Sequence, residues 1–206
     1  MSVMTLWDYA KSSASYRVRI ALNLLGEPYE IETVDLLDDA HKSDAHLARN
    51  PQGLVPVLDI DGHRLTQSLA ILDYLDTTRD MRLLPTDDPA RRAKVIALAH
   101  CLAVDVHPVC NRSVMEYATG GAEPARTEWM QRFIGRGLRA FEILLADLDP
   151  APFVTGAHPG LAEICLIPQL YNADRWGVDY DHCPGIKALQ TTCNAHPAFQ
   201  RAYPGA

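Results

Sequence analysis

The sequence predicts an α/β domain followed by an all-helical domain, and three observations support this prediction. Within the first 80 of the 206 residues, segments with strand-like alternation take turns with segments of helical spacing. A stretch rich in proline and aspartate, "LLPTDDP", follows at 83–89. Beyond it, the apolar residues recur only at helical spacing. We therefore expect an α/β domain at residues 1–82, a linker at 83–88 and an all-helical domain at 89–206.

The α/β domain is expected to begin with a βαβ unit. Residues 3–9 and 29–36 alternate apolar and polar side chains as strands do. Between them we predict a helix at 15–25, because its apolar residues share one helical face and Gly26 follows. That face consists of Val18, Ala21, Leu22 and Leu25.

A ββα unit is expected to complete this domain, after a weakly patterned stretch at 37–50 with room for a short helix. Residues 54–67 read as a hairpin turning at Asp61-Gly62, and a helix is predicted at 68–78. Pro56 falls inside the first hairpin strand, where proline removes a ladder donor. We therefore expect Pro56 at a strand start, with the cis isomer as a candidate.

In the second domain, the apolar spacing predicts helices with extended core faces. One helix spans residues 95–102, a longer one spans 130–148, and a third at 160–176 contains Pro168. Two shorter helices are expected to close the chain. The predicted core positions of the longest helix are Met130, Phe133, Ile134, Gly137, Leu138, Phe141, Leu144, Leu145 and Leu148.

The composition excludes several classes of partner. With 19 Lys and Arg against 26 Asp and Glu, the net charge is −7, and the basic residues form pairs rather than a long stripe. This argues against nucleic-acid binding. No apolar run approaches the roughly 18 residues that span a bilayer, and the first ten residues do not read as a leader. Five cysteines without a CxxC pattern fit a reducing compartment, so we expect a cytoplasmic protein without membrane association.

Two further sequence patterns, a glycine-containing segment and the histidines, are not predicted to form binding sites. The segment "GRGLRA" at 135–140 matches a dinucleotide-binding fingerprint, but no strand precedes it, so small-residue packing within a helix explains it. The eight histidines form no metal-ligand pattern, and no metal is expected. Four of them are expected on the surface: His41, His46, His63 and His182.

Three serines crowd the start of the first predicted helix: Ser12, Ser13 and Ser15. One of them is expected to cap the helix by accepting a hydrogen bond from a free amide, and we assign this role to Ser15. Capping does not account for the other two serines.

The predicted element order, with Pro56 in a strand and a helical domain behind it, resembles the glutathione transferase architecture, whose first domain is thioredoxin-like. Four segments resemble the zeta class in particular, which comprises maleylacetoacetate isomerases and related bacterial maleylpyruvate isomerases. They are "SSASYRVRIAL", "NPQGLVPVLDIDGHRLTQSLAILDYL", "HPVCNRSVMEY" and "CLIPQLYNADRWGVD", and the resemblance covers nearly the whole chain. Ala14 replaces the cysteine of the class's SSCS motif. Gly160 stands where a Thr or Ser caps the sixth helix, which predicts a cap weaker by about 1 kcal/mol.

The resemblance implies that glutathione is the cofactor. Redox relatives of this fold keep a cysteine at the start of the first helix, whereas this chain has serine there and no cysteine before Cys101. The reactive sulfur would therefore belong to glutathione. Ser12 would donate to its thiolate and Ser13 would be a second donor, which makes these two the implied catalytic residues. The implied cofactor-binding set is Ser12, Ser13, Ser15, Val55, Gln67, Ser68, His107, Asn111, Arg112 and Ser113.

Several of these residues have alternative explanations. The backbone of Val55 would pair with the cysteinyl unit, while Gln67 and Ser68 would hold the γ-glutamyl carboxylate at a helix N-terminus. Plain N-capping explains Ser68 equally well, and a position before a Pro108 kink explains His107 equally well.

The resemblance also implies a substrate with two carboxylates, which call for cationic donors. Lys11, Arg112 and Arg175 are the candidates, and ordinary surface charge is the alternative, more so for Lys11 than for Arg175. The implied reaction is the cis–trans isomerisation of maleylacetoacetate or maleylpyruvate, and the implied assembly is a homodimer. Two alternatives remain: a glutathione transferase or dehalogenase acting on small halogenated acids or aromatics, and a non-catalytic association module.

Overall fold

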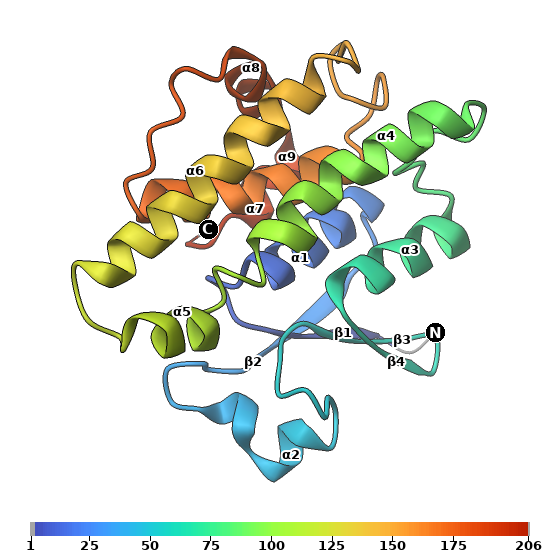
Figure 1. The fold of residues 1–206 in the computed structure, drawn as a ribbon. Coiled ribbons are helices and arrows are strands. Elements are labelled where there is room, and N and C mark those ends of the chain that lie inside the picture. The colour runs from blue at the N-terminus through green and yellow to red at the C-terminus, as the bar shows by residue number, and fades with distance from the viewer. Residues whose placement is uncertain (1–2, 206) are drawn as a thin grey trace. The chain divides into compact units, whose positions relative to one another are not determined.

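The computed structural model describes residues 3–205, and their contacts divide them into two compact units (Figure 1). One unit contains residues 3–81 together with 197–205, and the other contains residues 82–196. The boundary lies beside the expected linker. The division differs from the sequence expectation in one respect, because the last residues pack with the first unit instead of the helical one.

The first unit is built on a four-stranded sheet with the order β2-β1-β3-β4. The strands are β1 (Met4–Asp8), β2 (Tyr29–Thr33), β3 (Val57–Ile60) and β4 (His63–Thr66). β1 and β2 are parallel, as the connection through a helix requires, and the other pairs are antiparallel. Asp61 and Gly62 join β3 to β4 with positive φ values of 52° and 78°, as the predicted Asp-Gly turn demands. Pro56 directly precedes β3, and its peptide bond with Val55 is cis.

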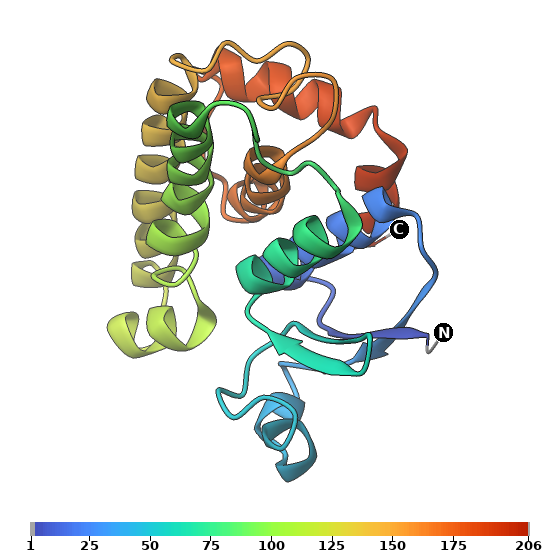
Figure 2. The same ribbon diagram turned by 90° about the vertical axis from the view of Figure 1, so that its right-hand side faces the viewer.

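Two helices cover one face of this sheet, α1 (Ser13–Leu25) and α3 (Ser68–Arg79) (Figure 2). The short helices η1 (Ala40–Lys42) and α2 (Asp44–Leu47) lie on the opposite side, within the stretch where a short helix was expected. Of the predicted α1 face, Val18, Ala21 and Leu22 are fully buried and Leu25 is half-buried.

A buried ion pair ties the C-terminal helix α9 (Pro197–Ala202) to this unit. Arg19 of α1 donates from Nη1 to both carboxylate oxygens of Asp8 at 2.8 Å, and both side chains are about 95% buried. Its Nε donates to the carbonyl of Ala202 at 3.1 Å, and its Nη2 donates to the carbonyl of Ala10 at 2.7 Å. One guanidinium therefore joins the end of β1, the loop before α1 and α9. This explains why the last residues belong to the first unit.

The second unit is helical. Its elements are α4 (Pro89–His100), the π-helix η2 (Cys101–Val106), α5 (Arg112–Thr119), α6 (Ala125–Leu145), α7 (Leu161–Arg175) and α8 (Pro184–Asn194). α4 and α6 lie side by side in both views (Figures 1 and 2), and α7 packs against α4. The predicted core face of α6 is buried except for Phe133, which is half-buried, and Leu144, which is 44% exposed. α7 continues through Pro168 to Arg175.

Small residues let η2 approach α6. A Cβ atom built on Gly137 would lie 2.2 Å from Cγ2 of Val106, so only glycine fits there. The thiol of Cys101 also reaches the carbonyl of Gly137 at 3.7 Å. Helix packing therefore explains Gly137, as the sequence predicted, whereas a Cβ atom at Gly135 would make only ordinary contacts of 3.5 Å or more.

Gly160 at the start of α7 has no side chain to cap the helix, as expected, but Glu163 makes compensating hydrogen bonds there. The buried carboxylate of Glu163 accepts hydrogen bonds at 2.8 Å from the backbone N–H groups of Gly160 and Val154. Burial raises the pKa of Glu163, and these two donors oppose that shift. A Cβ atom at Gly160 would lie 2.8 Å from the Leu83 carbonyl oxygen and 2.6 Å from a methyl of Thr155. Space therefore requires glycine at position 160, and Glu163 satisfies the N–H groups of Gly160 and Val154 without replacing the acceptor that a Ser or Thr at 160 would supply.

Candidate active site

Three segments of the predicted site meet at one edge of the first unit's sheet. The register pairs Trp7 of β1 with Val57 of β3, and Val57 with Thr66 of β4. The end of β1, the start of β3 and the end of β4 are therefore neighbours. The chain continues from these points into the segments that contain Ser12, Val55 and Gln67. The fold thus brings the N-terminal group of predicted residues together.

The cap of α1 is Ser12, so the assignment of this role to Ser15 was wrong. α1 begins at Ser13, and Ser12 Oγ accepts a hydrogen bond from the Ser15 backbone N–H at 3.3 Å. Ser15 is fully buried, and its hydroxyl has no hydrogen-bond partner among the described residues. The error arose because helical periodicity locates a helix but leaves its first turn uncertain.

This geometry suits Ser12 to stabilise an anion. A serine hydroxyl has one hydrogen to donate and two lone pairs that accept. Since Ser12 Oγ accepts from the helix amide, its own hydrogen can be donated to a group outside the helix. The α1 N-terminus adds a positive electrostatic potential, and no acidic residue occupies the first turn. Ser12 can therefore cap the helix and donate to a thiolate simultaneously.

Two buried polar side chains hold the loop that presents Val55. His46 Nε2 lies 3.0 Å from the carbonyl oxygen of Leu54, and Asn50 Nδ2 donates to the same oxygen at 2.8 Å. A carbonyl can only accept, so the hydrogen of this contact is on His46 Nε2. His46 is 1% exposed, so its expected surface position was wrong. Asn50 also accepts from the backbone N–H of Gln52 at 3.1 Å, which closes the turn.

The Gln67-Ser68 segment also differs from the expected cap. The N-cap of α3 is Gln67, with φ of 66°, and Ser68 is the first helical residue. The Gln67 amide donates to Gln52 Oε1 at 2.7 Å, which links this segment to the Val55 loop. Ser68 is buried, and its Oγ accepts a hydrogen bond from Nε of Arg17 at 3.1 Å. Arg17 was not among the predicted site residues, although arginines at 17 and 19, within the run of the predicted helix, are a signal of paired polar groups.

The other predicted residues belong to the second unit. Asn111 caps α5 by accepting from the Ser113 backbone N–H at 3.4 Å, and Arg112 forms an exposed ion pair with Glu116 at 2.7 Å. His107 follows η2 and is half-buried. The structure groups Asn111, Arg112 and Ser113 at the first turn of α5, just after His107.

Among the candidate cations, Lys11 is exposed in the loop before α1. Arg175 is the last residue of α7, and its guanidinium carbon lies 5.7 Å from the ring centre of Tyr171. Both side chains are accessible to a ligand.

The chain's own thiols are poor nucleophiles. All five cysteines are free, and four of them are buried. Burial raises the pKa of Cys110 to about 12 and also raises the pKa values of Cys101, Cys183 and Cys193. These four thiols favour the protonated form, and Cys165 is only 1% exposed within α7, so a ligand's thiol is the better candidate for thiolate chemistry.

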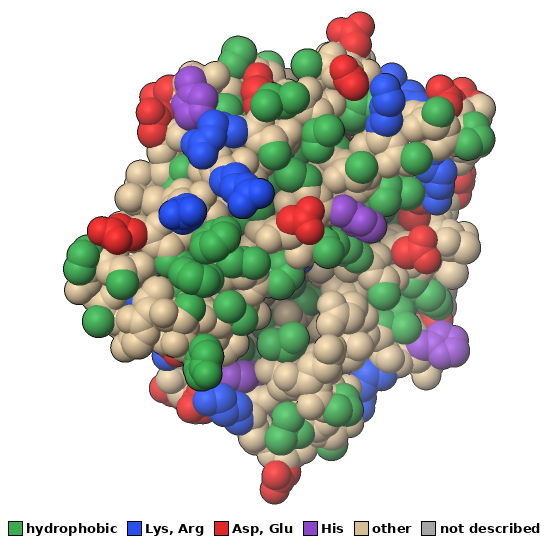
Figure 3. All heavy atoms as spheres, in the orientation of Figure 1, with side chains coloured by type: hydrophobic (Ala, Val, Ile, Leu, Met, Phe, Trp, Pro, Cys, Tyr) green, Lys and Arg blue, Asp and Glu red, His purple; other side chains and the backbone are tan. Residues whose placement is uncertain are grey.

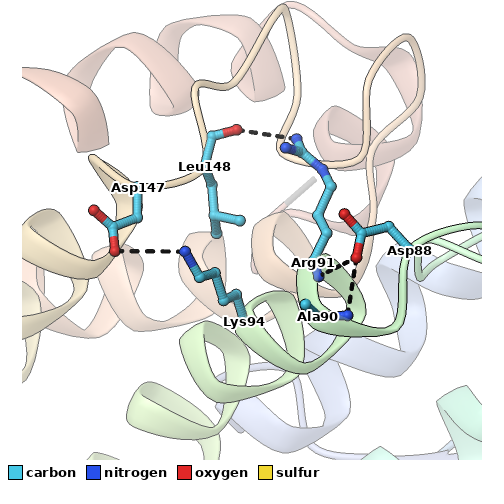
Figure 4. A pocket seen from close by; sticks show the side chains of 6 residues that line it. All are labelled: Asp88, Ala90, Arg91, Lys94, Asp147 and Leu148. Carbon is cyan, nitrogen blue, oxygen red and sulfur yellow. Dashed lines mark hydrogen bonds and ion pairs between the residues drawn. The ribbon is translucent and has the colours of Figure 1, made fainter.

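Two surface features contain none of the predicted site residues. A hollow at the start of α4 is lined by Asp88, Ala90, Arg91, Lys94, Asp147 and Leu148 (Figure 4). Its polar groups are engaged with one another, as in the ion pair between Lys94 and Asp147 at 3.7 Å. Lys and Arg side chains also gather over α6 (Figure 3), where Arg132, Arg136 and Arg139 are exposed at helical spacing.

Residues 3–205 contain neither a metal-binding cluster nor a membrane-spanning helix. Within residues 3–205, no cluster of three His, Cys, Asp or Glu side chains is arranged to hold a metal ion. In the same range, no helix combines the length and apolar character needed to cross a bilayer.

Comparison with known families decides the assignment. Residues 2–77 match the model of the glutathione S-transferase N-terminal domain, and residues 127–205 match that of the C-terminal domain. The maleylacetoacetate isomerase of Rhizobium meliloti (strain 1021) is 55% identical over 97% of this chain and 95% of its own. The chain belongs to the glutathione S-transferase family.

Solved structures of the family show the same fold. A holo maleylpyruvate isomerase, described as a bacterial zeta-class glutathione S-transferase, has a TM-score of 0.92 and 41% identity over 98% of this chain and 97% of its own. A maleylacetoacetate isomerase from Anaeromyxobacter dehalogenans 2CP-1 with bound glutathione has a TM-score of 0.87 and 39% identity over 98% and 95% of the two chains. A second structure of that enzyme, with dicarboxyethyl glutathione and citrate, has a TM-score of 0.86 and 37% identity over 98% and 91%.

The residues of the first unit fit the cofactor of this family. The Ser12 hydroxyl accepts from its helix and can donate its hydrogen elsewhere. The Ser68 hydroxyl accepts from Arg17 and can likewise donate its hydrogen. The loop that presents the Val55 backbone is held through the carbonyl of Leu54. These groups suit a ligand with a thiol, a peptide unit and a carboxylate, which glutathione combines.

Proposed function

We propose that this chain catalyses the glutathione-dependent cis–trans isomerisation of a maleyl keto acid, either maleylacetoacetate or maleylpyruvate. The observation that carries the proposal is the 55% identity, over nearly the full length of both chains, to a maleylacetoacetate isomerase. The hydrogen-bond arrangement at Ser12 supports it, because the reaction requires a stabilised thiolate.

When bound, glutathione supplies a thiolate that adds to the cis double bond, allows rotation about the resulting single bond and leaves by elimination. The chain's contribution is to favour the thiolate. Lowering a thiol pKa of about 8.5 by two units requires roughly 2.7 kcal/mol. A hydrogen bond from the Ser12 hydroxyl to a charged sulfur supplies about 1.5–3 kcal/mol, and the α1 N-terminus adds about 0.3–2 kcal/mol. Ser13 is proposed as the second donor.

The substrate carboxylates are assigned to Lys11, Arg112 and Arg175. Arg112 has Glu116 as a partner, but both side chains are about half exposed, and such a pair contributes only about 0.3–0.5 kcal/mol. A substrate carboxylate can therefore replace Glu116 at small cost. Dicarboxyethyl glutathione, bound to the Anaeromyxobacter enzyme, supports this substrate class. It contains the carbon–sulfur bond that thiol addition to a maleyl double bond forms.

The assembly and the location are proposals carried by the family resemblance. A homodimer follows the pattern of the family. A cytoplasmic location agrees with five free cysteines, since disulfides are rare in reducing compartments.

A steady-state assay with maleylacetoacetate and maleylpyruvate, each with and without glutathione, tests the proposed function. We expect isomerisation of at least one acid, and only with glutathione present. Faster turnover of dichloroacetate than of both maleyl acids would favour the alternative of a transferase or dehalogenase. No turnover and no glutathione binding would favour a non-catalytic association module.

A further inference from the structure

Arg17 makes an unusual contact for a charged residue of α1. Arg17 is only 4% exposed, and Ser68 is 5% exposed. The Nε of Arg17 donates a hydrogen bond to the Ser68 hydroxyl. Arg17 and Ser68 are 51 positions apart in sequence and join α1 to α3 on the covered face of the sheet. Buried arginines carry a large desolvation cost, so the Arg17 guanidinium calls for hydrogen-bonded partners.

The contact determines what the Ser68 hydroxyl can do. Arginine has only donors, so Ser68 Oγ accepts through a lone pair. The Ser68 hydrogen is then directed away from Arg17 and is available to an acceptor. The same guanidinium places a permanent positive charge behind the hydroxyl, which strengthens a hydrogen bond to an anion.

The position of Ser68 favours an anionic acceptor. It is the first residue of α3, where backbone N–H groups and the helix dipole attract negative charge. Within the described chain, no side chain caps α3 and no acidic residue lies in its first turn. The Gln67 side chain, which precedes it, is engaged with Gln52.

We propose that Arg17 is a positioning residue for glutathione: it holds the Ser68 hydroxyl as a donor to the α-carboxylate of the γ-glutamyl unit. This inference rests on the proposed function and extends it from the thiol end of the cofactor to the opposite end. Arg17 acts through Ser68, so its proposed role is recognition of one carboxylate.

Calorimetric titrations of the full chain with two ligands separate recognition of the α-carboxylate from support of the fold. The first is glutathione, and the second is γ-aminobutyryl-cysteinyl-glycine, which lacks only the α-carboxylate. The wild-type protein is expected to prefer glutathione. Arg17→Met is expected to weaken glutathione binding about tenfold or more, because a hydrogen bond to a charged group is weakened or lost. The same substitution should change the Kd of the second ligand less than about twofold.

Further variants keep the test decisive. Ser68→Ala should also abolish the preference for glutathione over the second ligand, whereas Ser68→Thr should keep that preference. In the Ser68→Ala background, Arg17→Met should add little further loss. Arg64→Met is the control, because Arg64 on β4 pairs with Asp59 on β3 and is not the donor to Ser68. If Arg17→Met does not fold, Arg17→Lys, which keeps the charge but lacks the Nε donor, and Ser68→Ala decide the question by the same ratio of Kd values.

The outcomes distinguish this inference from the proposed function. Equal weakening of both ligands by Arg17→Met, or a wild-type protein without preference between them, would overturn the role of Arg17 while leaving glutathione binding intact. A wild-type protein that binds neither ligand would contradict the proposed function itself.

Discussion

Replacement of Ser12 by alanine is expected to lower kcat/KM for glutathione-dependent isomerisation about 10- to 100-fold, the loss typical of a hydrogen bond to a charged group. The bound thiol then loses its hydroxyl donor and keeps only the helix N-terminus. The same substitution removes the cap of α1 and should lower the free energy of unfolding by about 1 kcal/mol. Steady-state kinetics and urea unfolding measure the two effects.

Two control variants separate the cap from the thiol donor. Ser12→Asp retains a capping oxygen but places a negative charge beside the sulfur, so stability should persist while activity falls further. Ser12→Thr keeps both functions and should stay within a few-fold of the wild-type protein. Wild-type kcat/KM in Ser12→Ala would contradict the assignment.

Removal of one partner of the Arg19–Asp8 ion pair is expected to produce the largest loss of stability in the first unit. Arg19→Met or Asp8→Asn should lower the free energy of unfolding by about 3–5 kcal/mol, because a buried charge is left without its counter-charge. Arg19→Met also frees the carbonyls of Ala10 and Ala202. Denaturant unfolding measures the change.

An exposed ion pair provides the control. Lys42 and Asp39 lie 2.9 Å apart with both side chains at least 60% exposed, so Asp39→Asn should cost less than about 1 kcal/mol. The double variant Arg19→Met with Asp8→Leu should recover part of the loss, since it leaves no unpaired charge. Similar small effects for the buried and exposed pairs would show that Arg19 does not stabilise this unit.

Local patterns in the sequence predicted the elements whose cause is local. The Asp61-Gly62 turn followed from the need for two positive φ values, and the buried face of α1 followed from helical spacing. The position of Pro56 before β3 followed from the missing ladder donor. Glutathione and the site at the start of α1 came from the family resemblance and the absence of an early cysteine.

Non-local contacts account for most of what was missed. The return of α9 to the first unit depends on Arg19 reaching Ala202, a contact across 183 positions. The burial of His46 depends on Leu54, whose carbonyl it contacts. α5 was not predicted: it has only eight residues, and only Met115 among them is buried against the rest of its unit.

The two cap assignments failed for a different reason. At a helix start, several polar residues compete for the same role, and a shift of one to three positions exchanges the cap with its neighbours. Ser12 caps α1 in place of Ser15, and Gln67 precedes α3 in place of Ser68. These shifts matter for function, since they leave the hydrogens of the Ser12 and Ser68 hydroxyls to a ligand.

The titration of the glutathione thiol in its complex with this protein, followed by the ultraviolet absorbance of the thiolate, tests the central claim most directly. We expect a thiol pKa of about 6.5, two units below the ordinary value of about 8.5, and a return toward that value in Ser12→Ala. A bound thiol that titrates near its ordinary value in the wild-type protein would contradict the claim that the α1 N-terminus ionises glutathione.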